Sequence, residues 1–169
     1  MKTKKSSQPP FAPTPLAEIM RPATLDQFVG QHHLVADDLF LKKMIQDDQI
    51  SSLIFFGPPG SGKTTLAYII AHETQANFFT LSAVVSGKED LKKIIAEAST
   101  LKNLGTKTIL FLDEIHRWNK AQQDALLPWV ENGTVILIGA TTENPSFSLN
   151  SALLSRLRVL VLNQLTTED

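Results

Sequence analysis

The chain has 169 residues, 43% of them hydrophobic and 20% charged, as expected for a single globular domain with a complete core. The net charge of −1 gives no general electrostatic reason to bind nucleic acid, and the absence of cysteine excludes disulfides and thiolate metal sites. The polar, proline-containing start lacks the apolar core of a signal peptide, and no apolar run could cross a membrane, so we expect a cytoplasmic or nucleoid-associated location.

Apolar periodicity and turn residues divide the chain into successive elements. Residues 1–14 are rich in lysine, serine and proline and are predicted to be disordered, so one domain is expected over residues 15–169. A proline-closed amphipathic piece over 15–22 precedes a brief helix over 25–28, with Thr24 as its N-cap, and a helix over 38–47. Strands are predicted over 53–56, 78–81, 108–112, 134–140 and 159–162, and helices over 63–72, 88–102, 120–131 and 151–156.

This alternation of strands and helices predicts a parallel sheet covered on both faces, which is a three-layer α/β sandwich with five strands. The strand over 108–112 is apolar almost throughout, as in a strand that is buried on both faces. Right-handed connections place the loops after the strands along one edge of the sheet, and the ligands of such sheets bind at that edge.

The stretch that follows the first of these strands matches a phosphate-binding loop. The pattern G-x-x-x-x-G-K-[ST] is complete from Gly57 to Thr64, and a helix follows it. Lys63 is expected to reach the β- and γ-phosphates, and the Thr64 hydroxyl is expected to bind Mg²⁺. A surface turn beside a lysine is the simpler alternative, but the strand before and the helix after favour nucleotide binding. The predicted nucleotide-binding residues of the loop are Gly57, Pro58, Pro59, Gly60, Ser61, Gly62, Lys63, Thr64 and Thr65.

Two adjacent carboxylates follow the strand over 108–112. Asp113 is suited to hold Mg²⁺ opposite Thr64, because Mg²⁺ bound to phosphates takes few protein oxygens. Glu114 points elsewhere and is predicted to orient and polarise the attacking water. A solvated acidic turn is the alternative. His116 is expected to cap or pack beside the site.

The end of the strand over 134–140 supplies further polar candidates. Thr141 is the first choice for a residue that hydrogen-bonds the attacking water or the γ-phosphate, and Thr142 and Asn144 follow it. A Thr/Asn-rich turn before Pro145 fits the same residues equally well. Arg156, taken alone, would be a surface arginine or a member of a structural ion pair.

Taken together, these motifs resemble the clamp-loader group of the AAA+ ATPases, and within it the family of replication-associated recombination protein A and the Werner-helicase-interacting ATPase. The resemblance spans about residues 15–165. It rests on residues 15–18, 20–22, 28–31, 57–65, 81–83, 113–117, 119–125, 138–147 and 150–156.

The resemblance implies an ATP-hydrolysing enzyme with ATP and Mg²⁺ as cofactors, in a protein that maintains DNA replication and recombination at stalled forks. It makes Thr141 the polar sensor and Arg156 the arginine finger that completes a neighbouring subunit's site. It also implies an adenine site formed by Leu16, Met20, Arg21, Pro22, Val29 and Gly30.

The partners implied by the resemblance are single-stranded or forked DNA, replication-fork proteins such as single-strand binding protein, and further copies of the chain. The family continues into a helical lid and an oligomerisation region, and both are expected to be absent here, so hydrolysis should be weak without assembly. The missing lid keeps a non-catalytic nucleotide-binding module as an alternative. A small P-loop phosphotransferase is less favoured, because Asp113 and Glu114 indicate hydrolysis.

Overall fold

The computed structural model describes residues 22–36 and 39–167. Five parallel strands form one sheet in the order β2-β3-β4-β1-β5, which confirms the predicted three-layer α/β fold. The strand that precedes the glycine-rich loop therefore lies between β4 and β5. The strands are β1 (Leu53–Phe56), β2 (Asn77–Ser82), β3 (Thr108–Asp113), β4 (Ile136–Thr141) and β5 (Arg158–Val161).

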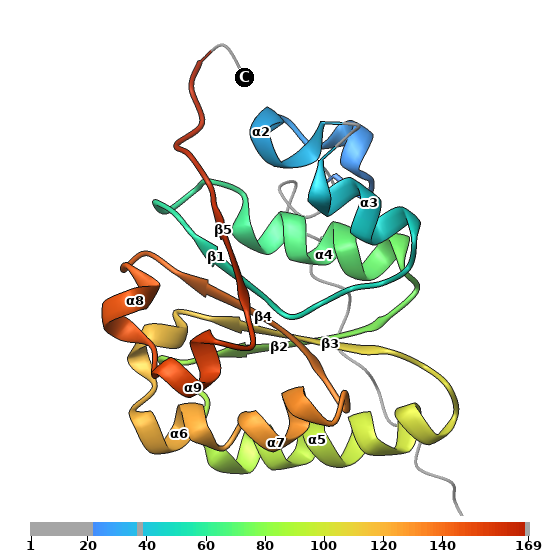
Figure 1. The fold of residues 1–169 in the computed structure, drawn as a ribbon, viewed down its shortest axis with the longest axis vertical. Coiled ribbons are helices and arrows are strands. Elements are labelled where there is room, and N and C mark those ends of the chain that lie inside the picture. The colour runs from blue at the N-terminus through green and yellow to red at the C-terminus, as the bar shows by residue number, and fades with distance from the viewer. Residues whose placement is uncertain (1–21, 37–38, 168–169) are drawn as a thin grey trace, which may run out of the picture.

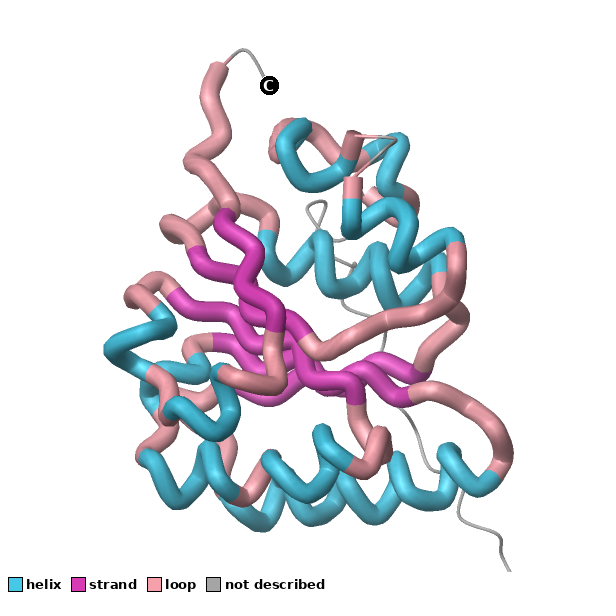
Figure 2. Tube along the Cα trace, in the orientation of Figure 1, coloured by secondary structure: helices cyan, strands magenta, loops and turns pink. Residues whose placement is uncertain are grey.

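Helices cover both faces of this sheet (Figure 1). On one face lie α2 (His32–Val35), α3 (Phe40–Gln46) and α4 (Lys63–Glu73), and on the other lie α5 (Lys88–Asn103), α6 (Lys120–Asp124) and α7 (Leu127–Glu131). The short helices α8 (Pro145–Ser148) and α9 (Ser151–Leu154) follow β4. Figure 2 shows the strands as the middle layer between these two groups of helices.

The central strands are apolar on both sides because each face of the sheet has its own hydrophobic core. Phe55 and Phe111 pack with α3 and α4, whereas their neighbours Ile54 and Leu110 pack with α5 and the segment around Leu126. Alternate residues of a strand point to opposite faces, so one continuous apolar run fills both cores. The sequence prediction for the strand over 108–112 follows from the same rule.

The helix predicted over 120–131 is wrong, because two short helices occupy that range. Asn119 caps α6, its side chain accepting from the backbone N–H of Gln122, and α6 ends at Asp124. Pro128 lacks the N–H that would bond the carbonyl of Asp124, and its ring would clash with that carbonyl. A new helix, α7, therefore begins at Leu127, where proline is tolerated in the first turn.

The N-terminal segment and the segment after β4 also differ from the sequence predictions. The helix predicted over 25–28 is a 3₁₀ turn, η1 (Leu25–Gln27), and the Thr24 side chain makes no capping hydrogen bond there. The one-turn helix α8, which was not predicted from the sequence, begins at Pro145 and is capped by the Asn144 side chain, which accepts from the N–H of Ser146.

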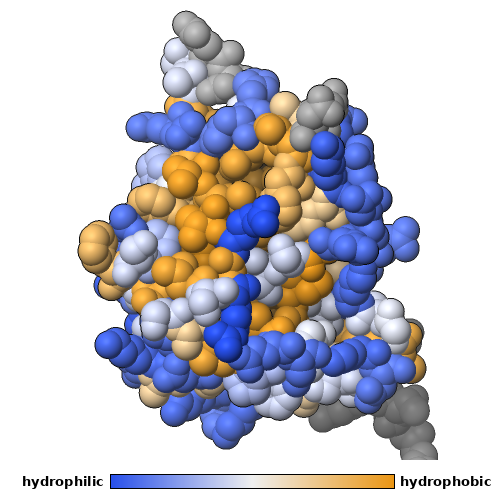
Figure 3. All heavy atoms as spheres, viewed as in Figure 1, coloured by the Kyte–Doolittle hydropathy of each residue, from blue (hydrophilic) through white to orange (hydrophobic). Residues whose placement is uncertain are grey.

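One edge of the sheet is formed by β5, whose side chains are mostly exposed. Val159 and Val161 are 39% and 48% exposed, and Figure 3 shows apolar surface over the part of the molecule where β5 lies. The Arg158 guanidinium lies 3.7 Å from the centre of the Phe40 ring, which is also on this side. In the part of the chain that the structure describes, no helix has the length and apolar character needed to span a bilayer.

Candidate active site

Sheet order and register place the segments that follow β1, β3 and β4 at the same end of the sheet, beyond the carboxyl ends of the strands. Phe56, the last residue of β1, pairs with Thr141, the last residue of β4. Leu112 of β3 pairs with Gly139 of β4, so Asp113, the next residue of β3, lies at the same end of the sheet, on the strand beside β4. Gly57 then donates its N–H to the Thr141 carbonyl at 3.2 Å. The glycine-rich loop, the end of β4 and the carboxylates after β3 are therefore neighbours.

Three glycines of the loop are required for different physical reasons. Gly60 and Gly62 have φ values of +74° and +93°, which side chains other than glycine rarely adopt. Gly57 has an ordinary φ, but a Cβ there would lie well inside 3.0 Å of the Leu162 carbonyl oxygen. Glycine is therefore required at position 57 because the chain leaving β1 closely approaches the chain leaving β5.

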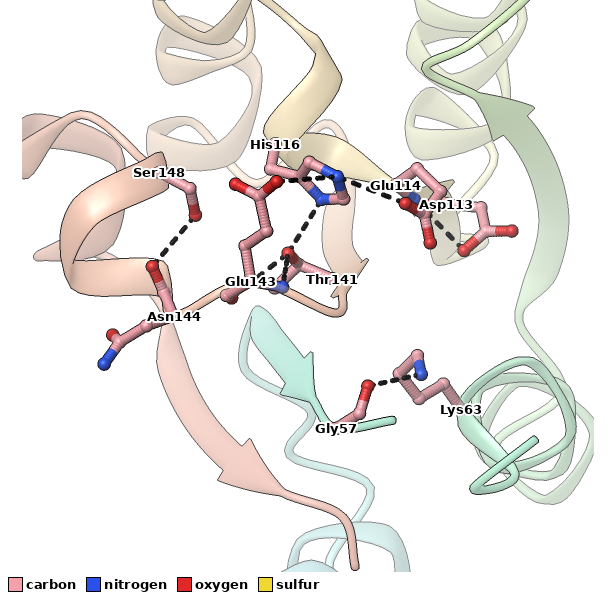
Figure 4. Close-up of polar contacts among 9 residues, drawn as sticks. All are labelled: Gly57, Lys63, Asp113, Glu114, His116, Thr141, Glu143, Asn144 and Ser148. Atoms are coloured by element: carbon pink, nitrogen blue, oxygen red, sulfur yellow. Dashed lines mark hydrogen bonds and ion pairs between the residues drawn. The ribbon is translucent and has the colours of Figure 1, made fainter. Parts of the chain in front are cut away.

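Lys63 begins α4 and folds back over the loop. Its Nζ donates to the carbonyls of Gly57 at 2.8 Å and Pro58 at 2.7 Å, as Figure 4 shows for Gly57. Burial lowers the pKa of Lys63, and the nearby charges of Asp113 and Glu114 oppose that shift. The lysine and both carboxylates therefore share one electrostatic environment.

Most of the predicted phosphate-binding residues and both predicted metal ligands line one open cleft of about 390 Å³, within the ~300–1,000 Å³ usual for small-molecule sites. Thr64, whose hydroxyl was predicted to bind Mg²⁺, faces this cleft from the start of α4, and Asp113 and Glu114 face it from the end of β3. Gly57, Pro58 and Ser61 belong to the loop but do not line the cleft. Its lining residues are Pro59, Gly60, Gly62, Lys63, Thr64, Thr65, Asp113, Glu114 and Thr142.

The two carboxylates diverge because the backbone turns sharply between them. Asp113 is the last residue of β3, and Glu114 has a positive φ of 54°. The Glu114 N–H donates to the Asp113 carboxylate at 3.1 Å, which holds Asp113 at the strand end. The Glu114 side chain is directed to His116 instead, as Figure 4 shows. The geometry gives two adjacent acids two separate positions, as their predicted roles require.

The polar residues after β4 lie at different depths. Thr141 is fully buried, and its hydroxyl contacts the Glu143 N–H at 3.0 Å and His116 Nδ1 at 2.9 Å. Thr142, the second choice from the sequence, lines the cleft itself. Asn144 caps α8, and its side chain is used there. The sensor role of Thr141 stays a prediction, and the contact with His116 is the route by which it would reach the site.

The segment predicted to surround the adenine lies beside the loop where the structure describes it. A Cβ at Gly62 would meet the Phe28 ring, so the residues before Val29 and Gly30 pack against the loop. Gln31, which is buried with a positive φ of 55°, donates its amide to the Ser61 carbonyl at 3.2 Å and to the Asn163 carbonyl at 2.6 Å.

The Asn163 N–H in turn donates to the Gln31 side-chain oxygen at 2.8 Å. Sequence reasoning missed this triple anchor, because its partners lie 30 and 132 residues away. Pro22 is described but shows no contact that tests its adenine role. Leu16, Met20, Arg21 and the predicted tail over 1–14 lie outside the described residues.

Arg156 does not line the cleft that its own chain forms. Its guanidinium pairs with the Glu131 carboxylate of α7, and Nη1 donates to the Ala152 carbonyl at 2.8 Å. The Arg156 side chain is 41% exposed, so it is held on the surface away from Lys63 and Asp113. A role in a neighbouring subunit stays a prediction.

A parallel sheet that presents a glycine loop, a helix start, a buried lysine and a strand-end carboxylate to one cleft defines a P-loop nucleotide-binding domain. The model of the Holliday junction DNA helicase RuvB P-loop domain matches residues 20–159. The chain belongs to this family and is the core of an AAA+ ATPase.

Relatives and solved structures agree with this assignment. Replication-associated recombination protein A of Haemophilus influenzae is 56% identical over 155 residues, and ATPase WRNIP1 of Dictyostelium discoideum is 54% identical over 155 residues. The RuvB Holliday junction branch migration motor of Thermotoga maritima superposes with a TM-score of 0.67 at 34% identity, covering 88% of this chain and 50% of that one.

The two relatives are considerably longer than this chain. Each alignment covers 92% of this chain but only 35% of the H. influenzae protein and 18% of the D. discoideum protein. The comparisons therefore define the ATPase core, and the activities of the longer proteins are considered below as proposals.

Proposed function

We propose that the chain binds ATP with Mg²⁺ in the cleft between the glycine loop and the end of β3, and hydrolyses it. The observation that carries this proposal is that Lys63, Thr64, Asp113 and Glu114, on two different elements, line one cleft. Phosphates need a cation and free N–H groups, and the start of α4 supplies both.

The donor set also fits Mg²⁺. Thr64 offers a hydroxyl and Asp113 a carboxylate, and a magnesium ion bound to phosphates takes its remaining ligands from phosphate oxygens and water. When bound, the ion neutralises charge that develops on the phosphates during transfer. Lys63 adds a second positive charge beside them, in a buried position where its effect is screened less.

Glu114 is the proposed general base. Its carboxylate faces the cleft from a backbone position that separates it from Asp113, where it can accept a proton from an attacking water. The test is steady-state ATPase activity with Mg²⁺, with excess chelator, and in the Glu114→Gln variant. Turnover should disappear with the chelator and fall by about 10²–10⁴-fold in the variant, whereas ATP binding by the variant should persist. Equal turnover in Glu114→Gln would show that another group is the base.

We further propose that this ATPase core works on DNA within a replication or recombination protein. Two relatives named replication-associated recombination protein A and ATPase WRNIP1, each more than half identical, support this proposal, as does the fold shared with a branch migration motor. ATPase rates should be measured with and without single-stranded and forked DNA. Stimulation by DNA is expected, and its absence in an otherwise active protein would count against a DNA role for this core.

Self-assembly and a contact with single-strand binding protein are the remaining proposals from the family. The surface position of Arg156, outside its own cleft, fits a residue that acts on a neighbouring copy. Sedimentation of the chain with and without ATP and Mg²⁺ should reveal nucleotide-dependent association. Pull-down by purified single-strand binding protein tests the second partner.

A further inference from the structure

His116 lies between two predicted functional residues that the sequence separates widely. It is part of the 3₁₀ turn η2 (Ile115–Arg117), and its side chain is only 4% exposed. Nδ1 lies 2.9 Å from the Thr141 hydroxyl, and Nε2 lies 3.2 Å from a carboxylate oxygen of Glu114 (Figure 4). The more exposed Glu143 carboxylate is further away, 3.6 Å from Nε2.

The partners of the ring determine where its protons lie. A carboxylate only accepts, so a favourable contact of Nε2 with Glu114 or Glu143 requires a proton on Nε2. Nδ1 faces a hydroxyl, which can donate to a neutral ring or accept from a protonated one. In either state, Nε2 is the ring nitrogen that faces the two carboxylates.

His116 also completes a line of contacts from the phosphate loop to the proposed base. Gly57 of the loop donates to the Thr141 carbonyl, and the Thr141 hydroxyl contacts His116. His116 in turn contacts Glu114, whose own backbone is in the left-handed region. Glu114 has a flexible side chain that is 29% exposed, and the His116 ring is a rigid, buried neighbour that can fix one rotamer.

We propose that His116 is a positioning residue of the ATPase, which holds the Glu114 carboxylate in the orientation needed to activate water and ties it to Thr141. The inference rests on the proposed function, because orientation of Glu114 matters only if Glu114 is the base. A displacement of a catalytic group by about 1 Å can cost on the order of 100-fold in rate. The alternative is that the His116 ring only fills space between its own turn, η2, and β4.

Substitutions that each keep one of the two contacts separate these roles. His116→Gln places an amide near the position of Nε2 and keeps a donor for Glu114. His116→Asn reaches only the position of Nδ1 and keeps the contact with Thr141. We expect His116→Asn and His116→Ala to lower kcat by about 10–100-fold, as for other groups that orient a functional side chain. His116→Gln should retain most of kcat, and the Kd for ATP should be unchanged in all three.

A second comparison uses the Glu114→Gln background, where no base remains to be positioned. There, His116→Ala should cause little further loss of turnover, because residues that act as a unit are not additive. His72→Ala is the matched control, since His72 is an exposed histidine near the far end of α4, stacked on Tyr68. Its kcat should equal that of the unmodified chain.

The outcomes distinguish the two levels of the argument. If Glu114→Gln abolishes turnover but His116→Asn and His116→Ala do not lower it, the inference about His116 is wrong and the proposed function stands. The inference is also wrong if His116→Gln and His116→Asn lose equal activity together with ATP affinity and thermal stability, because that pattern marks a space-filling role. If the unmodified chain shows no turnover, or Glu114→Gln equals it, the proposed function fails first.

Discussion

Gly57→Ala tests the packing that sets the start of the phosphate loop. The φ of Gly57 suits any residue, so the cost is steric. The new Cβ would overlap the Leu162 carbonyl oxygen, and the two must separate by about 1 Å to reach an ordinary van der Waals contact. Leu162 cannot move freely, because its N–H donates to the Phe56 carbonyl at 2.7 Å and its side chain is 1% exposed.

The expected magnitude follows from these contacts. Overpacking of this kind costs about 1–3 kcal/mol of folding free energy, and the smaller entropy of the unfolded alanine chain offsets only about 0.4–1 kcal/mol. We expect a net loss of about 1–2 kcal/mol, which lowers the Tm of a domain this size by about 2–8 °C. Nucleotide binding should weaken as well, because the Gly57 carbonyl that accepts from Lys63 would shift with its residue.

Thermal unfolding followed by circular dichroism measures this effect, with Gly87→Ala as the matched control. Nothing lies within 4 Å of a Cβ at Gly87, and its φ of −123° is ordinary. Loss of the glycine N-cap and the gain in the unfolded chain should nearly cancel there, so the Tm should hardly change. An unchanged Tm for Gly57→Ala would refute the claim that the Leu162 carbonyl is a fixed obstacle.

Three further predictions test the core and the site. Lys63→Ala should weaken ATP binding by about 10–100-fold, as expected for losing hydrogen bonds to charged groups. Titration with a fluorescent nucleotide measures the affinity, and an unchanged affinity would contradict the prediction. Thr108→Val should raise the free energy of unfolding by up to about 1 kcal/mol, because the buried Thr108 hydroxyl has no hydrogen-bond partner among the described residues; urea unfolding with a lowered midpoint would contradict this. Mixing Arg156→Ala with Glu114→Gln chains should restore some ATPase activity if Arg156 acts on a neighbour, and a verified mixed oligomer without activity would exclude that role.

The strands and the phosphate loop could be predicted from sequence because their signals are local. The strand predicted over 53–56 coincides with β1, and the residues from Gly57 to Thr65 carry their own spacing. The same local signals failed at Pro128, where helical periodicity continued across a residue that cannot donate a hydrogen bond. Periodicity reports which face of an element is apolar, and it does not report whether the backbone is continuous.

The contacts of His116 and Gln31 could not be predicted because their partners come from other elements. His116 was expected only to cap or pack beside the site, and Thr141, which it contacts, lies 25 residues further along the chain. Pairing of β1 with β4, and of β4 with β3, brings these residues together, and that order is a property of the whole sheet. The roles of Glu114, Thr141 and Arg156 remain predictions that the proposed experiments test.

The Gln31 anchor has a mechanical consequence. One amide side chain holds the Ser61 carbonyl in the loop and both backbone groups of Asn163, just after β5. The backbone that follows β5 and the proposed phosphate-binding loop are thereby hydrogen-bonded to the same side chain. The position of the loop and the path of the chain after β5 are therefore coupled through the Gln31 side chain.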